Sequence, residues 1–146
     1  MKITVRVEVR PTENIEKVRK ALYNVFEPEK LEEKIEEDYR VLIAEGNCYK
    51  SLLKLHSLLR TQFILDAARE YLKRGMYDKG LVFYLNKQAA YVGVVSFCSF
   101  EYGESPLGAI VFHVETENPR RLIDWLAPRT INGRPIREIE PPSEDP

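Results

Sequence analysis

The first ten residues alternate between apolar and polar side chains. Apolar residues occupy every second position from Ile3 to Val9, and charged or hydroxyl side chains fill the positions between them. A period of two places the two kinds of side chain on opposite faces of a β-strand. Pro11 ends the pattern. We therefore predict a strand over residues 2–10 with one face in the core and one face in solvent.

A helical spacing follows this strand. Apolar residues recur at intervals of one to four positions at Ile15, Val18, Leu22, Val25 and Phe26. This spacing predicts a helix over residues 13–26, with Thr12 as its N-cap and Pro28 as its stop. The next stretch, residues 27–38, holds seven acidic and two basic residues, and we expect an exposed connection there, with or without a short strand.

The middle of the chain carries one further strand and the longest helical pattern. Residues 39–45 read as a strand that turns at Gly46. Leucines and aromatic residues then keep a helical spacing over 48–74 without a proline, up to Gly75. This pattern predicts one bent helix or two helices broken near Arg60-Thr61.

The second half predicts strands at 81–85, 92–98 and 109–115, and a helix that Asn118 caps and Pro119 begins. Turns are predicted at 104–108 and 132–133. The order β-α-β-α-β-β-β-α predicts an α+β two-layer sandwich, with a mostly antiparallel sheet and helices on one face. We expect a single domain over residues 1–136 and a disordered, acidic, proline-rich tail over 137–146.

Composition narrows the class of protein. The 146 residues carry a net charge of −1 with 44% hydrophobic residues, which is ordinary for a soluble globular domain. No apolar stretch approaches the 18 residues of a membrane span, so we expect no membrane partner. Only two cysteines, Cys48 and Cys98, are present, far apart and without a Cys-x-x-Cys pattern. Together with the lack of a targeting segment, they predict a cytoplasmic protein.

Few side chains favour catalysis or metal binding. If strands 92–98 and 109–115 paired with Phe97 opposite Phe112, Ser96 would lie beside His113, the start of a nucleophilic site. Cys48 and His56 are too far apart on a straight helix for direct contact. Two histidines and two cysteines offer no metal-ligand spacing. We expect no catalytic residue, no metal and no cofactor.

Basic residues are more informative. Residues 50–79 hold seven basic and three acidic side chains, and Lys87 follows between two amides. Such a local excess suits phosphate contacts, although it is also typical of an ordinary solvated helix face. Tyr77 and Tyr91 adjoin loops and are placed to stack on bases. The predicted RNA contacts are Arg60, Arg69, Lys73, Arg74, Asn86, Lys87 and Gln88.

Four segments carry a family resemblance: 9–13 (Val-Arg-Pro-Thr-Glu), 85–90 (Leu-Asn-Lys-Gln-Ala-Ala), 104–108 (Glu-Ser-Pro-Leu-Gly) and 123–128 (Ile-Asp-Trp-Leu-Ala-Pro). With these segments the chain resembles, over about residues 2–128, an archaeal family of uncharacterised proteins. That family is grouped by sequence with an RNA-binding domain and a predicted exosome-associated relative. The resemblance implies a fold similar to that of the large-subunit ribosomal protein L-five, and no catalytic residues.

These observations lead to two functional hypotheses. The first is a non-enzymatic RNA-binding module with salt-sensitive affinity. The second is a protein-interaction module without a nucleic-acid ligand, such as a homodimer formed through a sheet edge or the outer sheet face. Retention of RNA by the purified protein favours the first hypothesis. A molecular mass that depends on protein concentration, without retention of RNA, favours the second.

Overall fold

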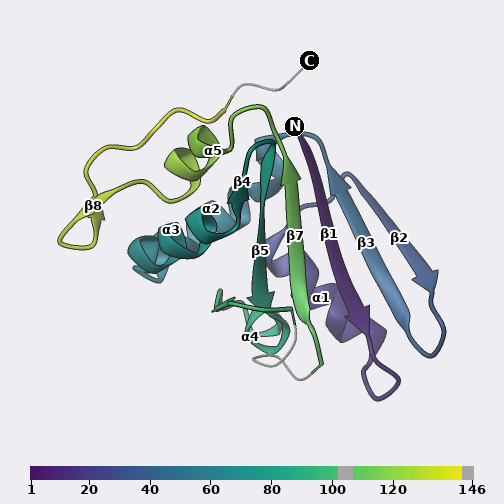
Figure 1. The fold of residues 1–146 in the computed structure, drawn as a ribbon. Helices are drawn as coiled ribbons and strands as arrows, with labels where there is room; N and C mark the ends of the chain where they lie inside the picture. Colours follow the sequence, from purple (N-terminus) through teal and green to yellow (C-terminus); the bar gives the residue numbers. More distant parts are fainter. Residues whose placement is uncertain (102–106, 143–146) are drawn as a thin grey trace.

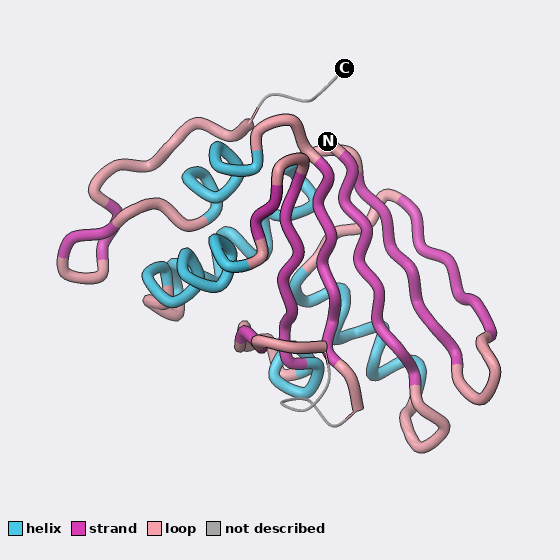
Figure 2. The backbone as a smooth tube through the Cα atoms, in the orientation of Figure 1, coloured by secondary structure: helices cyan, strands magenta, loops and turns pink. Residues whose placement is uncertain are grey.

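The computed structural model describes residues 1–101 and 107–142, which form one antiparallel sheet with helices packed against it (Figures 1 and 2). The strands of the sheet are β1 (Lys2–Val9), β2 (Lys30–Ile35), β3 (Arg40–Gly46), β4 (Met76–Tyr77), β5 (Gly80–Asn86), β6 (Phe97–Cys98) and β7 (Ala109–Glu115). The helices are α1 (Ile15–Val25), η1 (Tyr49–Leu52), α2 (Leu53–Thr61), α3 (Leu65–Arg74), α4 (Lys87–Tyr91) and α5 (Pro119–Leu126). A small hairpin joins β8 (Thr130–Ile131) to β9 (Arg134–Pro135).

The sheet has seven strands in the order β2-β3-β1-β7-β5-β4, with β6 paired to β5. All strand pairs are antiparallel. In Figure 1, α1 passes behind the strands, and α2, α3 and α5 gather beside β4 and β5. The predicted α+β class and its mostly antiparallel sheet are confirmed.

The core lies between the sheet and the helices. On β1, Ile3, Val5 and Val7 are completely buried, as the alternation predicts. They pack in one apolar cluster with residues such as Leu22 of α1 and Leu55 of α2. The opposite sheet face carries partly exposed side chains, among them Thr4, Arg6, Ile43, Tyr84, Val111 and His113.

One helix boundary differs from the sequence-based prediction, and another decides between two alternatives. The N-cap of α1 is Asn14 rather than Thr12, because the Asn14 side chain accepts hydrogen bonds from the backbone N–H groups of Glu16 and Lys17. Of the two alternatives left open for residues 48–74, the one with a break near Arg60-Thr61 is confirmed, because α2 ends at Thr61 and α3 begins at Leu65. The break falls at residues 62–64, where Phe63 has a φ of +56°. A helix cannot continue through that backbone conformation.

The predicted strand over 92–98 is wrong except at its end. Only Phe97–Cys98 form a strand, and they pair with β5 rather than β7. The backbone of Val95 is satisfied by the amide of Gln62, which donates to its carbonyl at 3.0 Å and accepts from its N–H at 2.8 Å. A side chain therefore supplies the partners that a neighbouring strand would have supplied.

The C-terminal segment begins as predicted. Asn118 caps α5 by accepting from the N–H of Arg121 at 3.1 Å, and Asn132-Gly133 turn the β8–β9 hairpin with φ values of +53° and +79°. In the segment predicted to be disordered, Glu138 accepts two hydrogen bonds from Arg60. The turn predicted at 104–108 lies mostly outside the described residues. None of the helices in residues 1–101 and 107–142 has the length and hydrophobicity of a membrane-spanning segment.

Candidate nucleic-acid interface around Lys87

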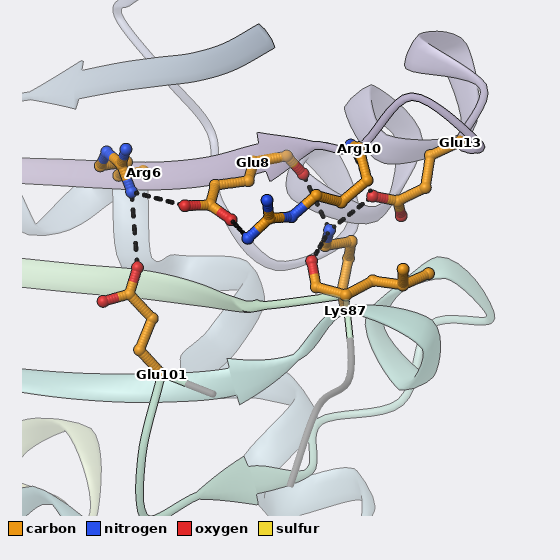
Figure 3. Close-up of polar contacts among 7 residues, drawn as sticks. Arg6, Glu8, Arg10, Glu13, Lys87 and Glu101 are labelled. Atoms are coloured by element: carbon orange, nitrogen blue, oxygen red, sulfur yellow. Dashed lines mark hydrogen bonds and ion pairs between the residues drawn. The ribbon is translucent and has the colours of Figure 1, made fainter. Parts of the chain in front are cut away.

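Lys87, the first residue of α4, joins three segments that are distant in the sequence. Its side chain is buried, and its Nζ donates to the backbone oxygen of Glu8 at 2.8 Å, to Oε1 of Glu13 at 2.9 Å and to the backbone oxygen of Leu107 at 2.7 Å (Figure 3). An ammonium group has three donors, and Lys87 uses all of them. Three of the segments that carry the family resemblance thus meet at one nitrogen atom.

Charged side chains continue outward from Lys87 (Figure 3). The carboxylate of Glu13 also accepts from the backbone N–H of Arg10 at 2.9 Å. The Glu8 carboxylate, itself almost completely buried, lies 2.5 Å from Arg10 and 3.5 Å from Arg6. Burial lowers the pKa of Lys87, and the neighbouring carboxylates of Glu13 and Glu8 oppose that shift. These contacts make Lys87 a fixed structural cation rather than a free phosphate ligand.

The local sequence explains how Lys87 is aimed inward. Asn86 is the N-cap of α4, and its Oδ1 accepts from the backbone N–H of Ala89 at 2.8 Å. An N-cap fixes where the helix begins and therefore the direction of the next side chain. Gln88, one position further, is exposed. The three neighbours predicted to contact RNA therefore have different roles. Asn86 caps the helix, Lys87 is a buried cation that links three segments, and Gln88 is an exposed amide.

A pocket of about 310 Å³ lies over the Lys87 side chain, between α1 and α4. Its lining includes Thr12, Glu13, Lys17, Lys87, Gln88 and Tyr91. Lys17 is exposed and makes no ion pair within the described part of the chain. The ammonium of Lys20 lies 4.9 Å from the centre of the Tyr91 ring, a cation–π contact. The lining thus combines the exposed cation of Lys17, an amide and an aromatic ring, and Lys20 adds a second exposed cation against that ring.

Arg60 and Arg69 lie elsewhere and are committed to the C-terminal end of α5. Arg60 donates to the backbone oxygens of Leu126 at 3.0 Å and Trp125 at 3.2 Å. Arg69 is 8% exposed and donates to the backbone oxygen of Ala127 at 3.0 Å. The last carbonyls of a helix lack partners within it, and these two guanidinium groups supply them. Both arginines therefore hold the fold together.

Lys73 and Arg74 are exposed at the end of α3, away from the pocket between α1 and α4. The Arg74 guanidinium lies 5.1 Å from the Tyr71 ring centre. Tyr77, predicted to stack on bases, instead has its hydroxyl 2.6 Å from Nε2 of His113. The predicted RNA contacts thus fall into separate groups.

Sequence reasoning missed Lys17 and Lys20, although their i, i+3 spacing on the polar face of α1 was a usable signal.

The suggested nucleophilic pair does not form. β5 lies between β6 and β7, so that Phe97 pairs with Leu85 whereas His113 pairs with Val82. Ser96, one residue before Phe97, is therefore about four residues from His113 along the strands, roughly 13 Å at 3.3 Å per residue. This distance is far beyond hydrogen-bond reach.

The other candidate groups also have structural surroundings. Cys48 is buried at the start of η1. His56 stacks on Trp125 with ring centres 4.7 Å apart. Burial and the nearby Arg60 lower the pKa of His56. Within residues 1–101 and 107–142, no three His, Cys, Asp or Glu side chains are grouped to hold a metal ion.

Comparison with known sequences places this arrangement in a family. A family model described as RNA binding matches residues 2–116. The chain is 50% identical over 143 residues to a UPF0201 protein of Pyrobaculum arsenaticum, covering 97% of this chain and 99% of the relative. It is 46% identical over 136 residues to one of Saccharolobus solfataricus, covering 93% of each. The chain belongs to the UPF0201 family.

Solved structures agree with this assignment. The UPF0201 protein of Methanococcus jannaschii superposes with a TM-score of 0.82 at 38% identity, covering 94% of this chain and all of that chain. A DUF54 protein of Methanothermobacter thermautotrophicus is more distant, with a TM-score of 0.52 at 22% identity over 80% of this chain and 84% of that one. The DUF54 likeness shows a shared fold alone. The resemblance found from the sequence is thus confirmed for UPF0201 and its RNA-binding family model.

Proposed function

We propose that this UPF0201 protein is a non-enzymatic RNA-binding protein whose contact surface is the pocket between α1 and α4. The observation that carries the proposal is the RNA-binding family model over residues 2–116, a region that contains the whole lining of this pocket. The fold similar to ribosomal protein L-five, which the sequence resemblance implies, stays a prediction and agrees with such a role.

The chemistry of the pocket rim supports the proposal. Lys17 offers an ammonium that no carboxylate neutralises among the described residues, and Lys20 is held over Tyr91. Ammonium groups bind phosphate, the exposed Gln88 offers both a donor and an acceptor for base edges, and an aromatic ring offers a stacking surface. Because the net charge is −1, attraction to RNA depends on such a local surface rather than on the whole molecule.

Lys87 has an indirect role in this proposal. Its ammonium fixes the floor of the pocket by holding α4, the turn before α1 and the segment before β7 together. A pocket whose walls are held rigidly loses less entropy when a ligand binds. Removing Lys87 therefore disturbs the shape of the pocket, whereas removing Lys17 or Lys20 disturbs only its charge.

The test is binding of total cellular RNA, and of one retained species, as a function of salt. We expect Lys17→Gln/Lys20→Gln to weaken binding and to reduce the slope of log K against log salt by about 1.4, since each single-strand phosphate contact contributes about 0.7. The matched control is Lys30→Gln/Lys34→Gln on β2, which removes the same charge from exposed positions. Equal losses in both variants would show that net charge, and not this pocket, governs binding. No RNA retention by the wild-type protein at low salt would overturn the function itself.

One observation favours a second candidate, the protein-interaction module. The outer sheet face presents partly exposed apolar side chains on the adjacent strands β5 and β7, including Val82, Tyr84 and Val111. Such a surface suits a second copy of this chain. Sedimentation equilibrium over a wide concentration range tests this alternative, and a constant monomer mass without RNA contradicts it.

A further inference from the structure

A second hollow is lined mostly by residues beyond the region that the RNA-binding family model matches. It has a volume of about 480 Å³, and four arginines line it: Arg69, Arg120, Arg129 and Arg137. The chain leaves α5, runs out to the β8–β9 hairpin and returns past α5 (Figure 1). The backbone N–H of Ile136 donates to the carbonyl of Arg129 at 2.9 Å, and Arg129 and Arg137 line the same hollow. We call this hollow the arginine groove.

The charge of the arginine groove is largely uncompensated. Residues 119–137 contain five arginines, no lysine and a single carboxylate, Asp124. That carboxylate is already paired, because Nη2 of Arg69 lies 2.9 Å from its Oδ1. Arg120, Arg129 and Arg137 are exposed, and none of them forms an ion pair within residues 1–101 and 107–142. Three guanidinium groups without an ion pair among the described residues therefore line a hollow whose one carboxylate, that of Asp124, is already neutralised by Arg69.

This arrangement suits one kind of anion in particular. A guanidinium is a planar fork that matches two oxygen atoms of a phosphate, which explains why arginine rather than lysine dominates such sites. Three guanidinium groups around one hollow suit a single ligand group with three terminal oxygens and a charge of about −1.5 to −2. A phosphate monoester has both properties. An internal phosphodiester of RNA carries one negative charge and two terminal oxygens. Within an RNA strand, a monoester occurs only at an end.

The wall of the groove supports a nucleoside beside the phosphate. Ile136, which is 60% exposed, and the half-buried Ile139 line it with apolar surface. Apolar side chains next to a phosphate site suit the flat faces of a base or the carbon atoms of a ribose. A free inorganic phosphate would leave this surface uncovered.

We propose that the arginine groove binds a phosphorylated nucleoside, in the form of the phosphorylated end of an RNA strand. This inference rests on the proposed RNA-binding function and adds a second contact to it. The pocket between α1 and α4 contacts the body of the strand, and the arginine groove distinguishes a phosphorylated end from a hydroxyl end.

The experiment compares one RNA sequence of about ten nucleotides in three forms: 5′-phosphorylated, 3′-phosphorylated and with hydroxyls at both ends. We expect wild-type protein to bind one phosphorylated form at least about 10-fold more tightly than the hydroxyl form, because a charge-assisted contact is worth more than one factor of ten. Arg129→Gln/Arg137→Gln is expected to remove this preference. Neither side chain has a partner in the described part of the chain, so the variant is expected to fold normally, which a thermal melt checks.

Two controls isolate the arginine groove. Lys34→Gln/Arg40→Gln removes two exposed cations from β2 and β3 and should leave the 10-fold preference intact. Lys17→Gln/Lys20→Gln should weaken all three RNAs by a similar factor and keep the ratio between them. These outcomes separate the recognition of a strand end from general attraction between opposite charges.

The possible failures are distinguishable. Equal affinity of wild-type protein for all three RNAs would overturn the inference and leave the RNA-binding function standing. Calorimetric binding of adenosine monophosphate without any RNA binding would overturn the proposed function, and its loss in Arg129→Gln/Arg137→Gln would assign the groove to a free nucleotide. If a phosphoserine peptide bound as tightly as adenosine monophosphate, the nucleoside part of the inference would be wrong.

Discussion

Replacing Lys87 with methionine tests whether its ammonium stabilises the fold by linking β1, the turn before α1 and the segment before β7. Methionine keeps most of the side-chain volume but removes the ammonium. The change leaves the Glu13 carboxylate, whose side chain is only 11% exposed, without its cation. It also leaves the backbone oxygens of Glu8 and Leu107 without the donors that they now have.

The expected magnitude follows from these lost contacts. Removing one partner of a buried ion pair typically costs about 3–5 kcal/mol, because the other charge remains buried and unpaired. Each stranded carbonyl adds a penalty of about 1 kcal/mol or more when water cannot reach it. Together these terms predict that Lys87→Met lowers the free energy of unfolding by about 5–7 kcal/mol, which corresponds to a loss of about 15–20 °C in Tm at about 3 °C per kcal/mol.

Urea unfolding at neutral pH and 25 °C measures this loss directly. The matched control is Lys73→Met, an exposed lysine on α3, which should change the free energy of unfolding by less than about 0.5 kcal/mol. The double variant Glu13→Gln/Lys87→Met should recover about 1–2 kcal/mol relative to Lys87→Met, because it removes the stranded charge. A loss below about 1 kcal/mol in Lys87→Met, or no recovery in the double variant, would refute this account of Lys87.

Two further predictions concern pH and close packing. Burial lowers the pKa of His56 in the folded protein. As the pH decreases below about 6.5, the unfolded chain therefore binds a proton before the folded protein does, and the free energy of unfolding decreases. His56→Phe should flatten this part of a Tm–pH curve, and an unchanged curve would contradict the assignment. At Gly75, an added Cβ would lie 1.7 Å from the backbone oxygen of Val82, so Gly75→Ala should cost about 2 kcal/mol or more. Gly133→Asn is the comparison, since that turn has a φ of +79° and open space around it; asparagine tolerates this backbone and should cost less than about 1 kcal/mol.

The elements that the sequence predicted well have signals within a few residues. The alternation in β7 and the Asn118-Pro119 start of α5 depend only on neighbouring positions, and both elements lie where predicted. The strand predicted over 92–98 failed because the amide of Gln62, more than 30 positions earlier, satisfies the backbone of Val95. A pattern of β-branched residues contains no information about such a distant partner.

The candidate site shows the same limit. The sequence drew attention to Lys87 and its two amide neighbours, but the burial of Lys87 depends on Glu13, which is 74 positions away. Counting charges also could not reveal that Arg60 and Arg69 are committed to the carbonyls at the end of α5. Positive residues are equivalent in a count, whereas the fold separates those that hold the chain together from those that face solvent.

The position of α5 affects how this protein can be divided experimentally. The family model ends at residue 116, which invites the use of a fragment that stops there. Such a fragment would lack Leu122, Trp125 and Leu126, which are buried in the same core as the helices beside them. It would also leave Arg60 and Arg69 facing a cavity instead of the α5 carbonyls. The end of the family model is therefore not a folding boundary, and an inactive or aggregated 2–116 fragment would reflect the missing core rather than the properties of the RNA-binding region.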